Sequence, residues 1–275
     1  MRYLELNFIK MHGCGNDFVI IDCRENAIQL SNEEIQLLCN RRVGIGCDQL
    51  VFINSKKTEK PTAHLNFWNT DGSSSDTCGN ATRCVASLLF EETSNSELYL
   101  ETDHTEILCK RDTNSKISVN MGKPRIGWSE IPLSKKIETL YLPLEGNPTA
   151  SNFGNPHCSF FVNNIEKYKI EKFGPIIENN QLFPRKTNVQ LVEVIDRRNI
   201  VMRVWERGSG VTLASGSSSC AAVDSGIRRN LLDKSVNVKV DGGELLVEKK
   251  DDGVWLTGPT KHVFSGIFTL IRNKT

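Results

Sequence analysis

Cys78 is the residue of this chain best placed to carry out chemistry. It follows a polar loop, residues 69–77, and precedes Gly79-Asn80, where an apolar helical pattern begins. A thiol at a helix N-terminus has its pKa lowered by unpaired N–H groups and the helix dipole. The same N–H groups can bind a carboxylate. This turn can therefore hold an amino-acid carboxylate and place a thiolate beside its α-carbon, with a buried structural cysteine as the alternative.

The surroundings of Cys78 are repeated later in the chain, with Ser215 in place of the cysteine. Ten residues separate Trp68 from Cys78, and ten separate Trp205 from Ser215. Further landmarks recur in the same order, namely Gly15-Asn16 with Gly154-Asn155, and Gln49-Leu50-Val51 with Gln190-Leu191-Val192. A repeat this long predicts two domains of one design. Facing each other, such domains would bring Cys78 and Ser215 to opposite sides of one ligand.

Other polar residues lie beside these landmarks. A serine hydroxyl such as that of Ser215 is a poor base without a basic neighbour. Arg207 could clamp a carboxylate and Glu206 could bind an ammonium group, although a solvent-facing ion pair is the simpler interpretation. Taken alone, His157 would be a surface-loop histidine. The neighbouring asparagines are residues typical of turns, namely Asn16, Asn69, Asn80, Asn155 and Asn188.

The elements that must position these residues are mostly strands. Alternating or β-branched segments predict strands at 64–68, 116–120, 200–205 and 236–240, and a hairpin turning at 251–253. Helices are expected after a capping box at 31–34, after Cys78, and from Ser215 to near residue 230. The fold class is α+β, with domains at 1–121 and 122–263. The last strand, within 264–275, is expected to rejoin the first domain.

The composition excludes several classes of protein. The chain has 275 residues with 34 basic and 33 acidic side chains, so no general attraction to nucleic acid or membranes is expected. We expect neither a secretory signal nor a membrane span. The nine cysteines show no metal-binding or disulfide spacing. They predict free thiols in a cytoplasmic protein without a metal site.

Taken together, several segments resemble the signatures of the diaminopimelate epimerase family. They follow the family order from residue 10 to about residue 222, namely Lys10–Phe18, Arg42–Gln49, Asn69–Cys84, Gly154–His157, Thr187-Asn188 and Trp205–Thr212. Enzymes of that family interconvert LL- and meso-diaminopimelate in lysine synthesis without pyridoxal phosphate or metal. The resemblance implies two pseudo-symmetric domains, each a mixed, mainly antiparallel sheet wrapped around a central helix, and a homodimer.

The resemblance also implies roles for individual residues. The family uses two cysteines as a thiolate and thiol pair, of which Cys78 would be one and position 215 the other. Glu206 and His157 would help set the charge state of these bases. Backbone N–H groups of Gly79, Asn80, Gly216 and Ser217 would hold the reacting carboxylate. The remaining matches would bind the substrate, chiefly its distant end: Asn16, Gln49, Asn69, Asn155, Asn188, Glu206 and Arg207.

The chain departs from the family at the second base. The family has Ala-Cys-Gly-[Thr/Ser]-Gly, whereas this chain has Ala214-Ser215-Gly216-Ser217-Ser218. Three explanations stay open: an epimerase impaired by an introduced serine, a one-base dehydratase or isomerase acting on another amino acid, and a non-catalytic relative that binds amino acids. A hydrolase using Cys78 and His157 is a further alternative.

Overall fold

The chain folds into two compact units. The computed structural model describes residues 2–75 and 78–272. Unit 1 comprises residues 1–117 and 260–275, and unit 2 comprises residues 118–259. Both limits lie four residues before the boundaries expected from the sequence.

Unit 1 is a mixed sheet with two helices. Its elements are β1 (Arg2–Gly13), β2 (Asn16–Asp22), α1 (Asn32–Cys39), β3 (Gln49–Asn54), β4 (Ala63–Asn69), β5 (Ser74–Ser75), α2 (Gly79–Glu91), β6 (Glu97–Glu101), β7 (Glu106–Arg111) and β17 (Lys261–Arg272). The terminal strand β17 pairs antiparallel with β1, and β1 forms a hairpin with β2. Parallel pairs β2–β3 and β4–β6 are joined by crossovers that contain α1 and α2.

Unit 2 has a corresponding set of elements. They are β8 (Ile117–Asn120), β9 (Thr149–Asn152), β10 (Pro156–Val162), η1 (Ile165–Lys167), α3 (Ile170–Glu178), β11 (Asn188–Asp196), β12 (Asn199–Glu206), β13 (Gly210–Thr212), α4 (Gly216–Arg228), β14 (Ser235–Val240), β15 (Gly243–Lys250) and β16 (Gly253–Gly258). The hairpin expected near residue 252 forms, but its loop is Asp251-Asp252, since Gly253 already pairs with Lys250.

The two units share one topology. In unit 2 the hairpin β9–β10 leads through α3 to the parallel strand β11, which pairs antiparallel with β12. The chain then passes through α4 to β14, parallel to β12, just as unit 1 passes through α2 to β6. The repeat read from the sequence is therefore a repeat of strand order and direction, and the expected α+β fold is confirmed.

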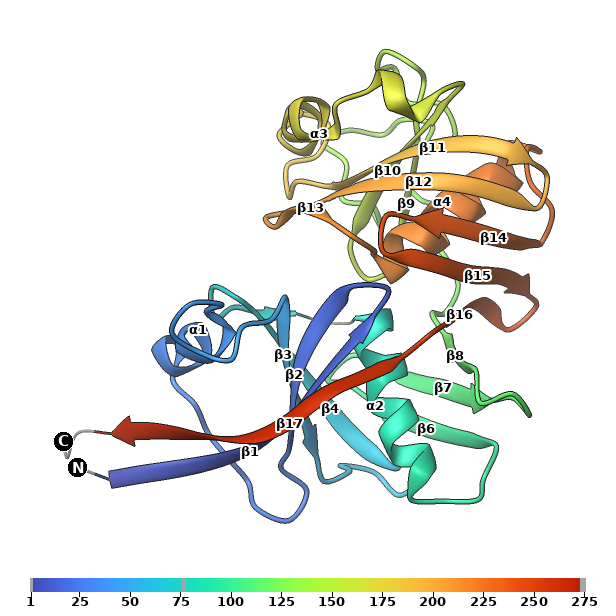
Figure 1. Cartoon of the computed structure of the whole chain (residues 1–275). Helices are drawn as coiled ribbons and strands as arrows, with labels where there is room; N and C mark the ends of the chain where they lie inside the picture. The colour runs from blue at the N-terminus through green and yellow to red at the C-terminus, as the bar shows by residue number, and fades with distance from the viewer. Residues whose placement is uncertain (1, 76–77, 273–275) are drawn as a thin grey trace. The chain divides into compact units, whose positions relative to one another are not determined.

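Each unit encloses one helix among its strands (Figure 1). In unit 1, α2 packs against β1, β2, β6 and β7. In unit 2, α4 packs against β9, β10, β11, β15 and β16. The early turns of α4 are built from small residues, and Ser218, Ser219 and Cys220 have no exposed surface. Small side chains allow the surrounding strands to approach this helix on all sides.

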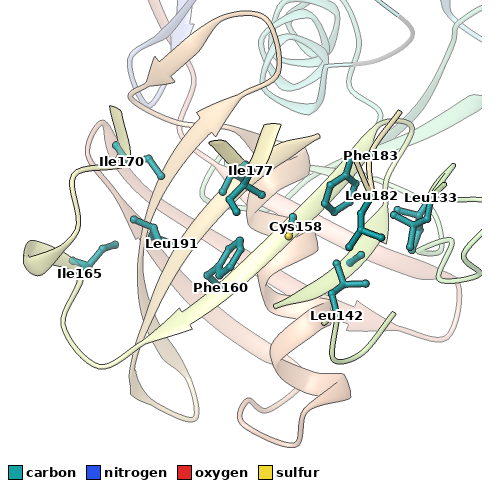
Figure 2. Close-up of a cluster of buried hydrophobic side chains, with 13 residues drawn as sticks. Leu133, Leu142, Cys158, Phe160, Ile165, Ile170, Ile177, Leu182, Phe183 and Leu191 are labelled. Atoms are coloured by element: carbon teal, nitrogen blue, oxygen red, sulfur yellow. The ribbon is translucent and has the colours of Figure 1, made fainter. Parts of the chain in front are cut away.

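The helix α3 was not expected from the sequence. Its start at Lys169 has no side-chain cap, and it contains Pro175 directly after Gly174. Both residues disfavour a helix interior, so local propensity argues against the observed structure. Packing outweighs propensity here, because Ile170 and Ile177 are buried in a hydrophobic cluster with Phe160 of β10 (Figure 2).

Gly174 is required by the packing of α3. A Cβ atom at this position would lie 2.3 Å from Cγ of Trp205. The indole cannot easily move away, because its Nε1–H donates to the Glu178 carboxylate at 2.6 Å. Overpacking of a tight core site costs about 1–3 kcal/mol, which exceeds the roughly 1 kcal/mol that alanine gains over glycine in helix propensity.

We therefore predict that Gly174→Ala lowers the free energy of unfolding in urea denaturation. Lys172→Ala, at an exposed position of the same helix, is the matched control and should be close to neutral. Equal stability of the two variants would contradict the packing argument.

Candidate functional site

Cys78 caps the start of α2. Its backbone is extended, with φ −148° and ψ 105°, and its Sγ accepts a hydrogen bond from the N–H of Ala81 at 3.5 Å. The Cys78 side chain is half-buried, whereas the other eight cysteines are buried. Cys84, six residues further along the chain in α2, is part of the core as expected, and burial raises the pKa of its thiol to about 12.

Two of the predicted asparagines meet beside this helix start. The Asn80 side chain donates to Oδ1 of Asn16 at 3.0 Å, and Asn16 donates to Oδ2 of Asp48 at 2.9 Å. Asn80, like Gly79 before it, is buried in the first turn of α2. Unit 1 therefore brings Asn16, Gly79 and Asn80 together at the helix start that Cys78 caps.

Gln49 and Asn69 form a second polar pair in unit 1. They are opposite each other in the antiparallel strands β3 and β4. Gln49 Nε2 donates to Asn69 Oδ1 at 3.1 Å, and Asn69 Nδ2 donates to Ser73 Oγ at 3.0 Å. The turn after β4 and the start of β3 thus present their amides at the same edge of the sheet.

Ser215 caps α4 in the same backbone conformation that Cys78 has at α2, with φ −138° and ψ 120°. Its hydroxyl makes no cap hydrogen bond to the helix. Instead Ser215 Oγ donates to Oε2 of Glu206 at 2.9 Å, and Thr212 Oγ1 donates to Oε1 of the same carboxylate at 2.5 Å. Ser215 therefore has the carboxylate of Glu206 as a basic neighbour.

His157 is a fully buried residue of β10, not the surface-loop residue that its flanking sequence indicates. Its Nε2 lies 2.7 Å from Oδ1 of Asn155, and its Nδ1 lies 3.0 Å from Nε2 of Gln190. Gln190 also donates to Ser218 Oγ at 3.0 Å. Burial, helped by the positive charge of Arg207, lowers the pKa of His157 to about 3. The ring is neutral at physiological pH, with Nε2 as the donor to Asn155.

Asn188 and Arg207 complete the polar group in unit 2. Asn188 is opposite His157 in the parallel strands β10 and β11, and its amide donates to the Pro156 carbonyl at 2.9 Å. Its Oδ1 accepts the backbone N–H of Arg207 at 2.9 Å. The Arg207 side chain is exposed, Gly216 is buried and Ser217 is half-buried in the first turn of α4.

The structure adds residues that the sequence did not single out as site residues. Gln190 binds His157, Thr212 binds Glu206, and Asp48 binds Asn16. Gln190 is the repeat counterpart of Gln49, so the repeat contained a signal for it. Asp48 and Thr212 stand inside the signature segments, but nothing in their local pattern distinguishes them from ordinary polar residues.

Neither a metal-binding cluster nor a membrane-spanning helix is found within 2–75 and 78–272. No group of three or more His, Cys, Asp or Glu side chains there is arranged to hold a metal ion. No helix among these residues is long and apolar enough to cross a membrane.

Comparison with known sequences places the chain in a family. The family model described as diaminopimelate epimerase matches residues 8–127 and 149–263. A diaminopimelate epimerase of Gluconobacter oxydans is 40% identical over 96% of this chain and 99% of that protein. One from Rhodospirillum centenum is 38% identical over 94% and 91%. The chain belongs to the diaminopimelate epimerase family. This confirms the resemblance seen in the sequence.

Two solved structures of other proteins share the architecture of this chain. A phenazine biosynthesis protein of the PhzF family from Bacillus anthracis superposes with a TM-score of 0.69 at 14% identity, over 98% of this chain and 100% of that one. A hydroxyproline epimerase from Agrobacterium vitis gives 0.68 at 11%, over 97% and 92%. At identities this low, the similarity between these two structures and this chain shows a shared fold alone.

The buried His157 makes stability depend on pH. An unfolded histidine has a pKa near 6.5, so between about pH 6.5 and 3 the unfolded chain binds a proton that the folded ring does not. Keeping the His157 ring neutral therefore contributes fully to the unfolding free energy above pH 6.5, and this contribution is lost as the pH falls. The loss by pH 5 is on the order of 2 kcal/mol.

We predict that His157→Gln flattens the fall in unfolding free energy between pH 7.5 and 5, measured by urea denaturation. His262→Gln, at an exposed histidine, should keep the parental slope. Should the glutamine variant not fold, NMR of the parent decides, since a His157 ring that titrates above pH 5 would contradict the prediction.

Proposed function

We propose that this protein is a diaminopimelate epimerase, interconverting LL- and meso-diaminopimelate in lysine biosynthesis without pyridoxal phosphate or metal. The observation that carries the proposal is the matched pair of helix starts, capped by Cys78 and Ser215 in the same backbone conformation. Near-full-length relatives that are about 40% identical and named diaminopimelate epimerase support the substrate.

In this proposal Cys78 is one proton-transfer group. The N–H of Ala81 directed at its Sγ favours the thiolate, because a donor stabilises the charged form. The thiolate removes the α-proton from one face of the substrate. The backbone N–H groups of Gly79 and Asn80, and of Gly216 and Ser217, hold the reacting carboxylate at the starts of the two helices.

The remaining site residues bind the rest of the substrate or tune the bases. Arg207 pairs with the distant carboxylate, and Glu206 contributes to binding of an ammonium group. His157, held neutral, fixes Asn155 and so acts on the site indirectly. The other binding residues are Asn16, Gln49, Asn69 and Asn188.

Ser215 serves the opposite face, less effectively than a cysteine would. Its hydroxyl proton is held by the Glu206 carboxylate at 2.9 Å. A hydroxyl with such a partner can deliver a proton to a carbanion, but it is a weaker base than a thiolate. We therefore expect slow epimerisation, with Cys78 more effective on its face than Ser215 on the other. We also propose a homodimer that works in the cytoplasm.

Restoring the thiol tests this proposal. Ser215→Cys should raise the rate of epimerisation by about 10²–10⁴-fold, the usual effect of a positioned acid or base. The reaction is followed by chiral chromatography of diaminopimelate and by α-proton exchange in deuterated water, without pyridoxal phosphate. Ser209→Cys, which adds an exposed thiol nearby, is the control, and Cys78→Ala should abolish exchange.

The outcomes separate the alternatives. A Ser215→Cys variant that binds diaminopimelate but exchanges no α-proton would identify a binding protein and exclude the proposal. An unsaturated product without inversion would identify a dehydratase. An acyl-enzyme burst on ester substrates would identify a hydrolase that uses Cys78.

A further inference from the structure

We propose that Asp48 and Arg83 are positioning residues that fix which way the amides of Asn16 and Asn80 point. The proposal rests on the proposed function, in which these two asparagines belong to the substrate site. The family signatures read from the sequence give neither Asp48 nor Arg83 a role.

A line of side-chain hydrogen bonds joins the four residues within unit 1. Asn16 Nδ2 donates to Asp48 Oδ2 at 2.9 Å, and Asn80 Nδ2 donates to Asn16 Oδ1 at 3.0 Å. Arg83 Nη2 donates to Asn80 Oδ1 at 2.9 Å. Asn16 is 7% exposed, Asn80 1% and Arg83 0%. Water therefore has little access to the bonds that Asn80 makes, whereas the Asp48 side chain is partly exposed.

Only the two ends of this line have a fixed hydrogen-bonding character. A carboxylate can only accept and a guanidinium can only donate, whereas an asparagine amide can do either after a half-turn. Because Asp48 accepts, Asn16 must turn its Nδ2 toward it, and Asn16 Oδ1 then selects the Nδ2 of Asn80. Arg83 imposes the same direction from the other end. Reversing either amide would bring two donors or two acceptors together in a buried place.

Asp48 is itself held firmly in place. Its Oδ2 also accepts the backbone N–H of Asp17 at 3.2 Å, and its backbone N–H donates to Asp17 Oδ1 at 3.0 Å. Although burial opposes the charge of Asp17, hydrogen bonds from Arg41 and Lys10 lower its pKa to about 2. Two N–H donors, one from Asn16 and one from the backbone of β2, thus converge on a single oxygen of Asp48.

The direction of this line matters because it passes through Asn80, in the first turn of the helix that Cys78 caps. It decides whether each amide offers an N–H or an oxygen to a bound carboxylate or ammonium group. What the site requires from residue 48 is an acceptor oxygen at the Oδ2 position, not a negative charge. Asparagine can supply that oxygen, and alanine cannot.

The test compares Asp48→Ala, Asp48→Asn and the control Arg41→Gln. Arg41 donates to Asp48 Oδ1 at 2.9 Å, but its side chain is 57% exposed and it makes no bond to Asn16 or Asn80 among the contacts above. The parent chain, with Ser215, is assayed by exchange of the α-proton of diaminopimelate in deuterated water at increasing substrate concentration. The side-chain amide signals of Asn16, identified by their loss in Asn16→Ala, are followed by NMR.

Asp48→Ala should raise KM for diaminopimelate about tenfold, with a smaller change in kcat, and should speed hydrogen exchange of the Asn16 amide. Asp48→Asn and Arg41→Gln should stay within about threefold of the parent in both measurements. An Asp48→Asn variant as impaired as Asp48→Ala would overturn the proposal, since charge would then be the requirement. An unchanged KM in Asp48→Ala would also overturn it.

The result stays separable from that of the proposed function. A parent chain that neither binds diaminopimelate nor exchanges its α-proton would refute the function. The NMR comparison of the three variants would still confirm or refute the fixed amide direction.

Discussion

The first turn of a helix leaves backbone N–H groups without partners inside the helix, and both halves of this protein place such a turn among polar side chains. In unit 1 the turn belongs to α2 and in unit 2 to α4, and each helix packs against several strands of its unit. An enclosed helix cannot satisfy its first N–H groups with bulk water alone. They must be satisfied by caps, by neighbouring side chains or by a bound anion. At α2 the Cys78 Sγ accepts from one of these N–H groups, whereas the Ser215 side chain does not cap α4.

Burial then determines how precisely those partners must be arranged. Asn80, His157 and Gln190 have almost no exposed surface, so each polar atom needs a partner within the protein. The Gln190 amide meets this need by donating both to His157 Nδ1 and to Ser218 Oγ. The burial that lowers the pKa of His157 also keeps its ring neutral, which is the state that such a donor requires. Stability and site geometry therefore depend on the same hydrogen bonds.

Much of this arrangement was predictable from the sequence, and the reasons are local. The capping box at Ser31, the apolar face that follows Cys78 and the ten-residue spacing from tryptophan to the cap all report structure within a short stretch of chain. The helix α3 was not predictable, because Ile170 and Ile177 gain their stability from strands distant in sequence. The burial of His157 was missed for the same reason, since nothing within its turn-like sequence indicates a strand between β9 and β11.

The two caps also show how one backbone conformation can give two residues opposite hydrogen-bonding roles. At α2 the sulfur of Cys78 accepts from the helix N–H of Ala81. At α4 the hydroxyl of Ser215 turns away from the helix and donates to Glu206. A hydrogen bond to an ionised carboxylate is charge-assisted and stronger than one between neutral groups, so Glu206 determines where the single Ser215 proton lies. The repeat conserves the position of the two groups, but the chemistry of each group is set by its neighbours. For this reason the sequence symmetry predicted where a second group would lie better than it predicted what that group does.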